Sequence, residues 1–147
     1  MQKKEALKIL KAGRYSCIAW DEQLVYQAAG MGVKPLITPM RERRDFFRGL
    51  QVGDTIIGKA AALLLALSGA KFVYGCIMSR AAVTVLQQQG IAYEYARLVD
   101  FIYNRQQNGL CPLEQAVLEE NDPERAWDRL EARIKELMAG QGDRGIL

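Results

Sequence analysis

The spacing of apolar residues along the chain predicts alternating helices and strands. In two segments of the first third, apolar residues recur every three or four positions, and this spacing indicates amphipathic helices. Between these segments, two short apolar runs flank Asp21 and Glu22, and this arrangement favours a β-hairpin. Gly13 ends the first helix, and Thr38 caps the second, whose first position is Pro39. The expected elements are a helix over 3–11, strands over 16–20 and 24–28, and a helix over 39–48.

The middle of the chain carries the strongest hydrophobic pattern. From Asp54 to Ser68, apolar residues cover nearly every side of a predicted helix, so we expect this helix in the centre of the domain. Glycines separate the later segments, and Ser79 caps the next helix. Because helices and strands alternate here, we expect parallel strands with helices on the faces of the sheet. The expected elements are a helix over 54–68, a strand over 71–77, a helix over 79–89 and a strand over 91–97.

The last third of the chain changes character. Residues 100–110 are polar and rich in turn formers, and two helices follow over 112–120 and 123–138, each with proline in its first turn. No internal repeat and no long linker divides the sequence. We therefore expect a single domain over 1–140 with a loose C-terminal tail over 141–147.

Composition and charge limit the classes of function. Of the 147 residues, 50% are apolar and 25% charged, with a formal net charge of +3, which is typical of one soluble domain and does not favour nucleic acid binding. The longest apolar run, Ala60 to Leu67, is far shorter than the roughly 20 residues that span a bilayer. Residues 1–11 are rich in lysine and contain no signal-peptide core. We expect a cytoplasmic protein that binds neither nucleic acid nor membranes.

The chain contains no histidine, which removes most catalytic triads and most zinc-water mechanisms. Its cysteines, Cys17, Cys76 and Cys111, are far apart in sequence and odd in number, so we expect free thiols in a reducing compartment. We expect no bound metal and no cofactor.

Lys59 is a candidate site residue because it lies in a helix that we expect to be buried. Burial disfavours the ammonium form, so a head group inside a pocket needs a carboxylate, from Asp54 or Glu114, or an anionic ligand. Alternatively, Lys59 lies at the rim with its stem packed and its head group in water. Residues 53–60 nearly match a phosphate-binding loop, but Ala60 replaces the required hydroxyl residue, and Asp54 is better explained as a helix cap.

Cys111 comes directly before a predicted helix, where the helix N-terminus favours the reactive thiolate. Glu114, at the third helical position, can reach back to the Cys111 amide as half of a capping box, and this structural role alone would explain it. Asn104 lies in the polar segment that Cys111 closes. We take Cys111 as a candidate nucleophile, and Asn104 and Glu114 as candidate ligand-binding residues.

The order of elements, together with residues 54–62, Asn104-Arg105 and 111–114, resembles the small prokaryotic family called domain of unknown function 1893. The resemblance covers residues 5–138. It implies the cytidine deaminase-like fold, which is an α/β fold with a mixed sheet in a three-layer α/β/α sandwich, and it implies no particular activity.

Zinc deaminases carry His-x-Glu and Pro-Cys-x-x-Cys at the starts of two helices. This chain has residues 58–61 and 78–82 at those places, without a metal ligand or the proton-transfer glutamate, so the resemblance implies that zinc-dependent deamination is excluded. It also implies a pocket between the two helix N-termini that holds Asp54, Lys59 and Ser79 and favours an anionic ligand.

Three hypotheses follow for the function. The first is a metal-free domain that binds a small anionic or nucleotide-like ligand through Lys59 and Ser79, near Asp54. The second is a metal-free enzyme in which Cys111 is the nucleophile and Lys59 or Asp54 handles charge or protons. The third is a non-catalytic, homo-oligomeric interaction or regulatory domain, and self-association is expected by analogy with the fold.

Overall fold

A five-stranded β-sheet runs through the centre of the molecule in the order β2-β1-β3-β4-β5. The computed structural model describes residues 1–141. The strands are β1 (Cys17–Trp20), β2 (Leu24–Ala28), β3 (Gln51–Ile57), β4 (Phe72–Ser79) and β5 (Ala92–Val99). The helices are α1 (Lys3–Lys11), α2 (Lys34–Glu42), α3 (Lys59–Ser68), α4 (Arg80–Gln88), α5 (Pro112–Ala116) and α6 (Pro123–Gln141).

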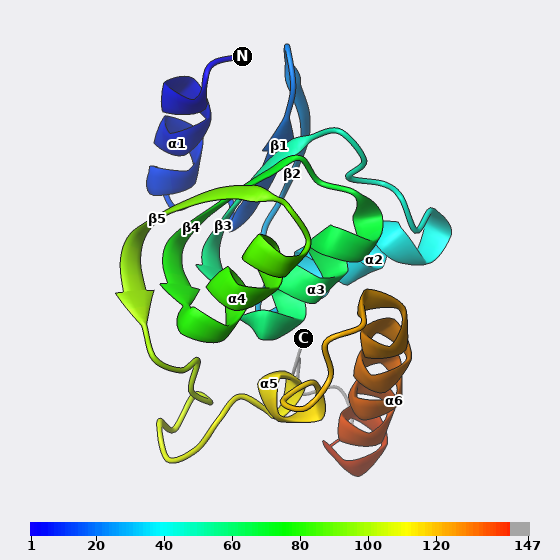
Figure 1. Cartoon of the computed structure of the whole chain (residues 1–147). Coiled ribbons are helices and arrows are strands. Elements are labelled where there is room, and N and C mark those ends of the chain that lie inside the picture. Colours follow the sequence, from blue (N-terminus) through cyan, green and yellow to red (C-terminus); the bar gives the residue numbers. More distant parts are fainter. Residues whose placement is uncertain (142–147) are drawn as a thin grey trace.

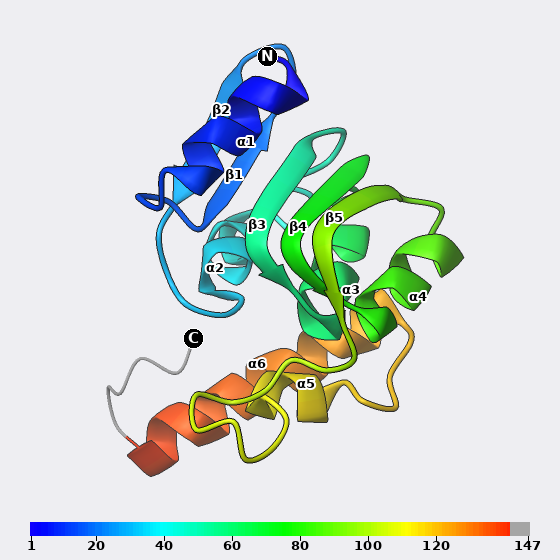
Figure 2. The ribbon, with the colours of Figure 1, turned by 90° about the vertical axis from the view of Figure 1, so that its left-hand side faces the viewer.

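The sheet is mixed and has helices on both faces. Strands β3, β4 and β5 run parallel, whereas β1 is antiparallel to both of its neighbours. Helix α1 covers one face, helices α2, α3 and α4 lie on the other, and α6 packs against α3 (Figures 1 and 2). This arrangement confirms the predicted α/β sandwich with a mixed sheet.

Two apolar cores lie on opposite faces of the sheet. The larger one centres on α3, where Leu63, Leu64 and Leu65 have no exposed surface. The smaller one lies under α1 and includes Leu10 and Trp20. Because α3 is buried on nearly every side, its all-round apolar character is explained by its central position.

The predicted helix over 54–68 is wrong in its first turn. Residues up to Ile57 form β3, and the helix begins only at Lys59. Asp54 therefore lies within a strand, opposite Cys17 of β1 and Gly75 of β4, and does not cap a helix. The β-branched residues before Gly58 favour a strand, and Gly58 separates them from the alanines that follow.

The predicted helix over 39–48 is also wrong. Helix α2 starts five residues earlier than Pro39, at Lys34, so Pro39 lies inside it, and the chain turns after Glu42. Proline has no amide hydrogen to donate to the carbonyl four positions before it, which is that of Pro35. The hydroxyl of Tyr26 donates to this oxygen at 2.8 Å instead. A tertiary hydrogen bond thus compensates for the proline within α2.

The other predicted elements are confirmed, with shifts of a residue or two at most of their ends. Ser79 caps α4, because the amide of Ala82 donates to its hydroxyl oxygen at 3.1 Å. Helix α5 begins at the predicted proline but is shorter than expected. Of the predicted tail over 141–147, all but Gln141 lies outside the described residues. No helix in the described part of the chain combines the length and the apolar character needed to cross a membrane.

Candidate functional site

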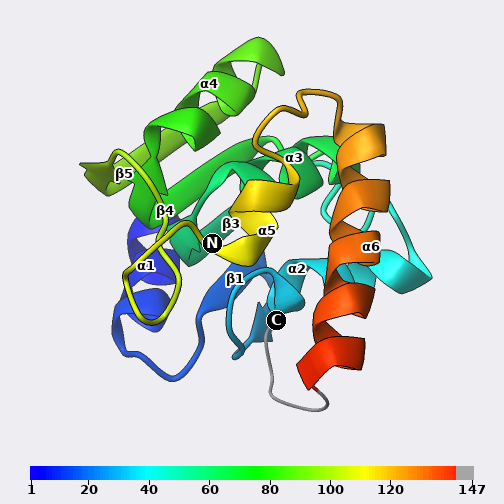
Figure 3. The same cartoon turned by 90° about the horizontal axis from the view of Figure 1, so that it is seen from below.

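A small cavity of about 50 Å³ lies beyond the carboxyl ends of the parallel strands. Figure 1 shows the arrows of β3, β4 and β5 pointing toward α5 and the segment over 100–111, and Figure 3 shows α5 and this segment from below. Each parallel strand leads directly into the lining. Residues that line the cavity are Lys59, Ser79, Ala81, Asp100, Phe101, Ile102, Leu110, Glu114 and Leu118.

Lys59 is the first residue of α3, and only 8% of its surface is exposed. Its Nζ donates a hydrogen bond to the backbone oxygen of Leu118 at 2.9 Å. Burial lowers the pKa of Lys59, although the charges of Glu114 and two nearby glutamates act in the opposite direction. None of the ion pairs within residues 1–141 includes Lys59. The head group therefore lies at the cavity, where a backbone oxygen is its hydrogen-bond partner.

Glu114 caps the helix that carries Lys59. One carboxylate oxygen accepts from the amide of Lys59 at 2.8 Å, and the other accepts from the amide of Ala60 at 2.7 Å. Burial raises the pKa of Glu114, and the two amide bonds and Lys59 oppose that shift. The carboxylate thus binds the N-terminus of α3, so the predicted capping box with the Cys111 amide is wrong.

Gly58 makes this cap possible. A Cβ atom at position 58 would lie 2.5 Å from Oε1 of Glu114, which is too close for any real contact. The backbone φ of Gly58 is −97°, a value that any residue adopts. The glycine is therefore required here for space and not for backbone conformation.

Ser79 brings a second polar group to the cavity from the end of β4. It is 1% exposed, and its oxygen accepts the Ala82 amide, which leaves its own hydroxyl proton to donate elsewhere. The N-termini of α3 and α4 are thus both bonded by side chains of the chain itself. The expected anionic ligand consequently depends on Lys59 and on the Ser79 hydroxyl rather than on free helix amides.

The remaining lining is largely apolar. Phe101, Ile102 and Leu110 come from the segment over 100–111, and they contribute hydrocarbon surface next to the polar groups. Asp100 is the exception, and its carboxylate accepts from Nε of Arg80 at 2.8 Å. Among the carboxylates that line the cavity, Glu114 therefore provides the main charge that stabilises the ammonium form of Lys59.

The structure brings together only part of the predicted site. Lys59, Ser79 and Glu114 line the cavity, whereas Asp54, Asn104 and Cys111 are not among its lining residues. Asn104 bonds within its own loop, where its Nδ2 donates to Oδ1 of Asn108 at 2.8 Å and its Oδ1 accepts from the Asn108 amide. Cys111 is half-buried at the start of α5 and packs against the larger core.

Asp54 belongs to a separate buried cluster within the sheet. It is 3% exposed, and burial raises its pKa to about 7 despite hydrogen bonds from Thr55 and Ile56. The Cys17 thiol lies on the neighbouring strand, and burial raises the pKa of this thiol as well. No sequence signal predicted this pairing, because 36 intervening residues separate the two positions along the chain.

Sequence reasoning missed the apolar lining and Leu118. Phe101 and Ile102 could have been found from their position directly after the last parallel strand, where ligand-contacting loops of α/β folds occur. Leu118 contributes a backbone oxygen, which no side-chain pattern reveals.

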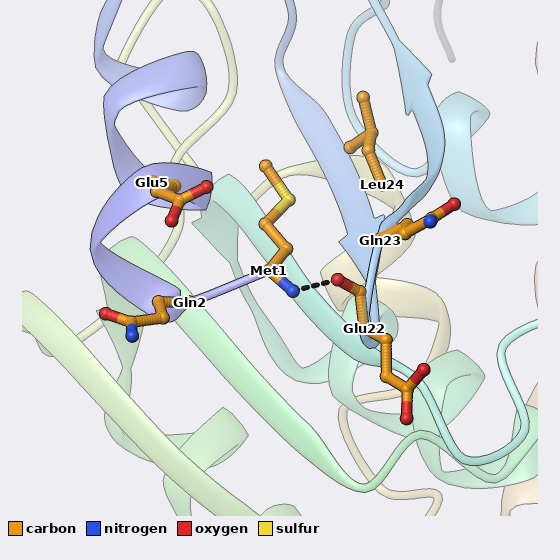
Figure 4. A pocket seen from close by; sticks show the side chains of 6 residues that line it. All are labelled: Met1, Gln2, Glu5, Glu22, Gln23 and Leu24. Carbon is orange, nitrogen blue, oxygen red and sulfur yellow. Dashed lines mark hydrogen bonds between the residues drawn. The ribbon is translucent and has the colours of Figure 1, made fainter.

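A second, larger hollow of about 420 Å³ lies far from these residues, between the N-terminus and the β1–β2 turn. Figure 4 shows its lining, in which the Met1 amino group donates to the backbone oxygen of Glu22. Apart from the half-buried Met1, the lining residues are exposed, so water already solvates their polar groups. Volume alone does not make this hollow a binding site. Within residues 1–141, no group of three or more cysteine, aspartate or glutamate side chains is arranged to hold a metal ion.

Comparisons with known proteins agree with the sequence resemblance. A family model described as domain of unknown function (DUF1893) matches residues 5–134. The crystal structure of a DUF1893 family protein from Thermotoga maritima is similar with a TM-score of 0.79 and 25% identity, covering 92% of each chain. The dCMP deaminase from the cyanophage S-TIM5 has a TM-score of 0.49 and 14% identity, covering 65% of this chain and 99% of its own. No curated protein matches the chain.

Proposed function

This chain belongs to the DUF1893 family, and we propose that it is a small-molecule-binding domain whose ligand is held at the Lys59 cavity. One observation carries the proposal, namely that the chain following each of three parallel strands lines the same cavity. Lys59 follows β3, Ser79 ends β4, and Asp100 follows β5. Open α/β sheets bind their ligands at this edge, outside the carboxyl ends of the strands.

The free hydrogen-bond donors favour a ligand with oxygen acceptors. An ammonium group has three donors, and the bond to Leu118 occupies one of those of Lys59. The Ser79 hydroxyl proton supplies a further donor. Carboxylate, phosphate and carbonyl oxygens all accept such bonds, so a small anionic ligand and a neutral carbonyl compound both suit the site.

The size of the cavity limits how much of a ligand is enclosed. A volume of about 50 Å³ holds a few atoms, comparable to a few waters. A nucleotide-like ligand would therefore insert only one polar group and leave its base and sugar outside, near the exposed side chain of Phe101. Compact acids and carbonyl compounds come closer to the size of the cavity than a nucleotide does.

A thermal-unfolding screen of small carboxylates, oxo acids, aldehydes, sugar phosphates and nucleotides tests this proposal. A ligand at about 100 times its dissociation constant stabilises by about 2.7 kcal/mol, which raises the melting temperature by several degrees in a domain of this size. We expect this shift in the wild type and its loss in Lys59→Met. Lys71→Met is the matched control, because Lys71 is exposed and pairs with Asp21.

Two results would contradict the proposal. One is the absence of any shift across the panel, and the other is an equal shift in the wild type and in Lys59→Met. Ser79→Ala gives an independent check, since it leaves the lysine in place. The affinity for the same ligand should fall in this variant as well.

A further inference from the structure

We propose that the amine of Lys59 forms a reversible imine with a small aldehyde or ketone that enters the cavity. This inference rests on the proposed function, because it names the chemistry by which the same site holds its ligand. It assigns Lys59 a covalent role beyond hydrogen bonding.

The surroundings of Lys59 favour an amine that loses its proton readily. Its head group has one hydrogen bond, to the neutral backbone oxygen of Leu118, and none of the ion pairs found within residues 1–141 includes it. The carboxylate of Glu114 has both oxygens occupied by the amides of Lys59 and Ala60. Consistent with this geometry, burial lowers the pKa of Lys59 and outweighs the opposing charges of Glu114, Glu119 and Glu120.

The other lysines with described partners lie in different surroundings. The head group of Lys71 pairs with Asp21 at 2.8 Å, and that of Lys3 pairs with Glu94 at 2.6 Å, with both lysines well exposed. A carboxylate partner stabilises the ammonium form, so pairing disfavours attack by the nitrogen lone pair. Each unit by which the pKa of one lysine falls below that of another raises its neutral, nucleophilic fraction about tenfold.

The cavity also favours the dehydration that an imine requires. Hydrocarbon from Phe101, Ile102 and Leu110 lines it, and its volume of about 50 Å³ admits only a few water molecules. Excluding bulk water from a site limits the hydrolysis of reactive intermediates. The Ser79 hydroxyl lines the same space, and its proton is free to bond to the carbonyl oxygen of the ligand.

The reaction balances without a further reagent. The nitrogen lone pair of Lys59 attacks the carbonyl carbon, a C–N bond forms, and the carbonyl oxygen takes up the proton released from nitrogen. The C–O bond then breaks, the oxygen leaves as water with a second proton from the amine, and a C=N bond remains. No oxidant, reductant or metal takes part, and water reverses the sequence.

Reductive trapping tests the inference on the intact protein. The wild type is incubated near neutral pH with propanal or with pyruvate, sodium cyanoborohydride is added, and the modified lysines are identified by peptide mass spectrometry. We expect rapid modification of Lys59 and much slower modification of Lys71. In Lys59→Arg, which keeps the charge but not the nucleophile, the rapid modification should disappear.

Measuring binding and trapping separately distinguishes this inference from the proposed function. Binding of propanal or pyruvate, with no faster trapping at Lys59 than at Lys71, would overturn the imine but keep the binding site. Absence of both binding and trapping would overturn both. If Lys59→Arg does not fold, lactate serves in its place, because a bound lactate should protect Lys59 of the wild type from trapping and leave Lys71 unaffected.

Discussion

Asp54 is a carboxyl group inside the sheet, and its charged form is disfavoured there. Burial raises its pKa in the folded state to about 7, from an ordinary value of 3.8. Between about pH 4 and pH 7, Asp54 therefore keeps its proton in the folded chain and loses it in the unfolded chain. Its contribution to stability is full below about pH 4 and is lost as the pH rises to about 7.

Replacing Asp54 by asparagine should remove this pH dependence. Relative to the wild type, Asp54→Asn should gain stability between about pH 4 and pH 8, by up to about 4 kcal/mol, because three pKa units correspond to roughly that free energy. Urea unfolding of both proteins across this range measures the difference. A stability difference that stays constant with pH would show that Asp54 titrates near its ordinary value.

The partners of Lys59 illustrate what a sequence conveys about a residue. Its burial followed from the apolar helix that contains it, and Glu114 was a predicted neighbour. The bond from Glu114 to the α3 amides was not predictable, because 55 positions separate Lys59 from Glu114 and only the folded chain brings them together.

At the scale of elements, the N-terminus of α3 is capped by Glu114, and the missing side chain of Gly58 leaves room for this carboxylate. Glu114→Ala removes the acceptor of two buried amides and should cost about 3 kcal/mol of unfolding free energy. Gly58→Ala should cost about 1–3 kcal/mol, since its Cβ displaces the same carboxylate. Chemical denaturation of both single variants measures these costs.

The double variant sharpens this prediction. Once Glu114 is replaced by alanine, nothing remains for the added methyl group to displace, so Gly58→Ala should then cost little. Additive costs in the double-mutant cycle would contradict the steric coupling of the two positions.

Helix α2 depends on a hydrogen bond from outside the helix. Tyr26→Phe keeps the ring contacts with Phe46 and Phe47 but removes the donor to the carbonyl of Pro35. We expect a loss of about 1–2 kcal/mol in unfolding free energy. Pro39→Ala provides the control, because alanine restores the amide donor to the carbonyl of Pro35 within the helix. In the Pro39→Ala background, Tyr26→Phe should therefore reduce the unfolding free energy by less.

The two errors in predicting elements have one physical origin. The predictions for residues 54–57 and for α2 are wrong because local propensity competes with tertiary contacts that only the folded chain supplies. The strand β3 is held by partners in β1 and β4, and α2 tolerates Pro39 because of Tyr26. Where local signals agree with the tertiary arrangement, as at Ser79 and in α1, the predictions are confirmed.

At the scale of the whole molecule, the topology builds the site. The hydrophobic pattern predicted the parallel passage of strands and helices, whereas the meeting of Lys59 and Ser79 was implied by the family resemblance. Within the segment over 100–111, the sequence indicated Asn104 and Cys111 and not the hydrophobic residues that line the cavity, because a loop without periodicity gives no information on its path.

Self-association stays a prediction by analogy with the fold. We expect it to use the apolar faces of the edge helices. We expect sedimentation equilibrium at micromolar concentration to give a mass above that of the 16.5 kDa chain. A mass equal to the single chain would contradict the homo-oligomer.

The most direct test of the central claim is an NMR titration of the lysine side chains, labelled with ¹³C at the carbon next to Nζ and assigned through Lys59→Arg. We expect the Lys59 signal to titrate below the ordinary lysine pKa of 10.5 and, alone among the lysine signals, to shift strongly when a compact oxygen-bearing ligand is added. A Lys59 signal that titrates at the ordinary value and responds to no ligand in the panel would contradict a binding role for Lys59.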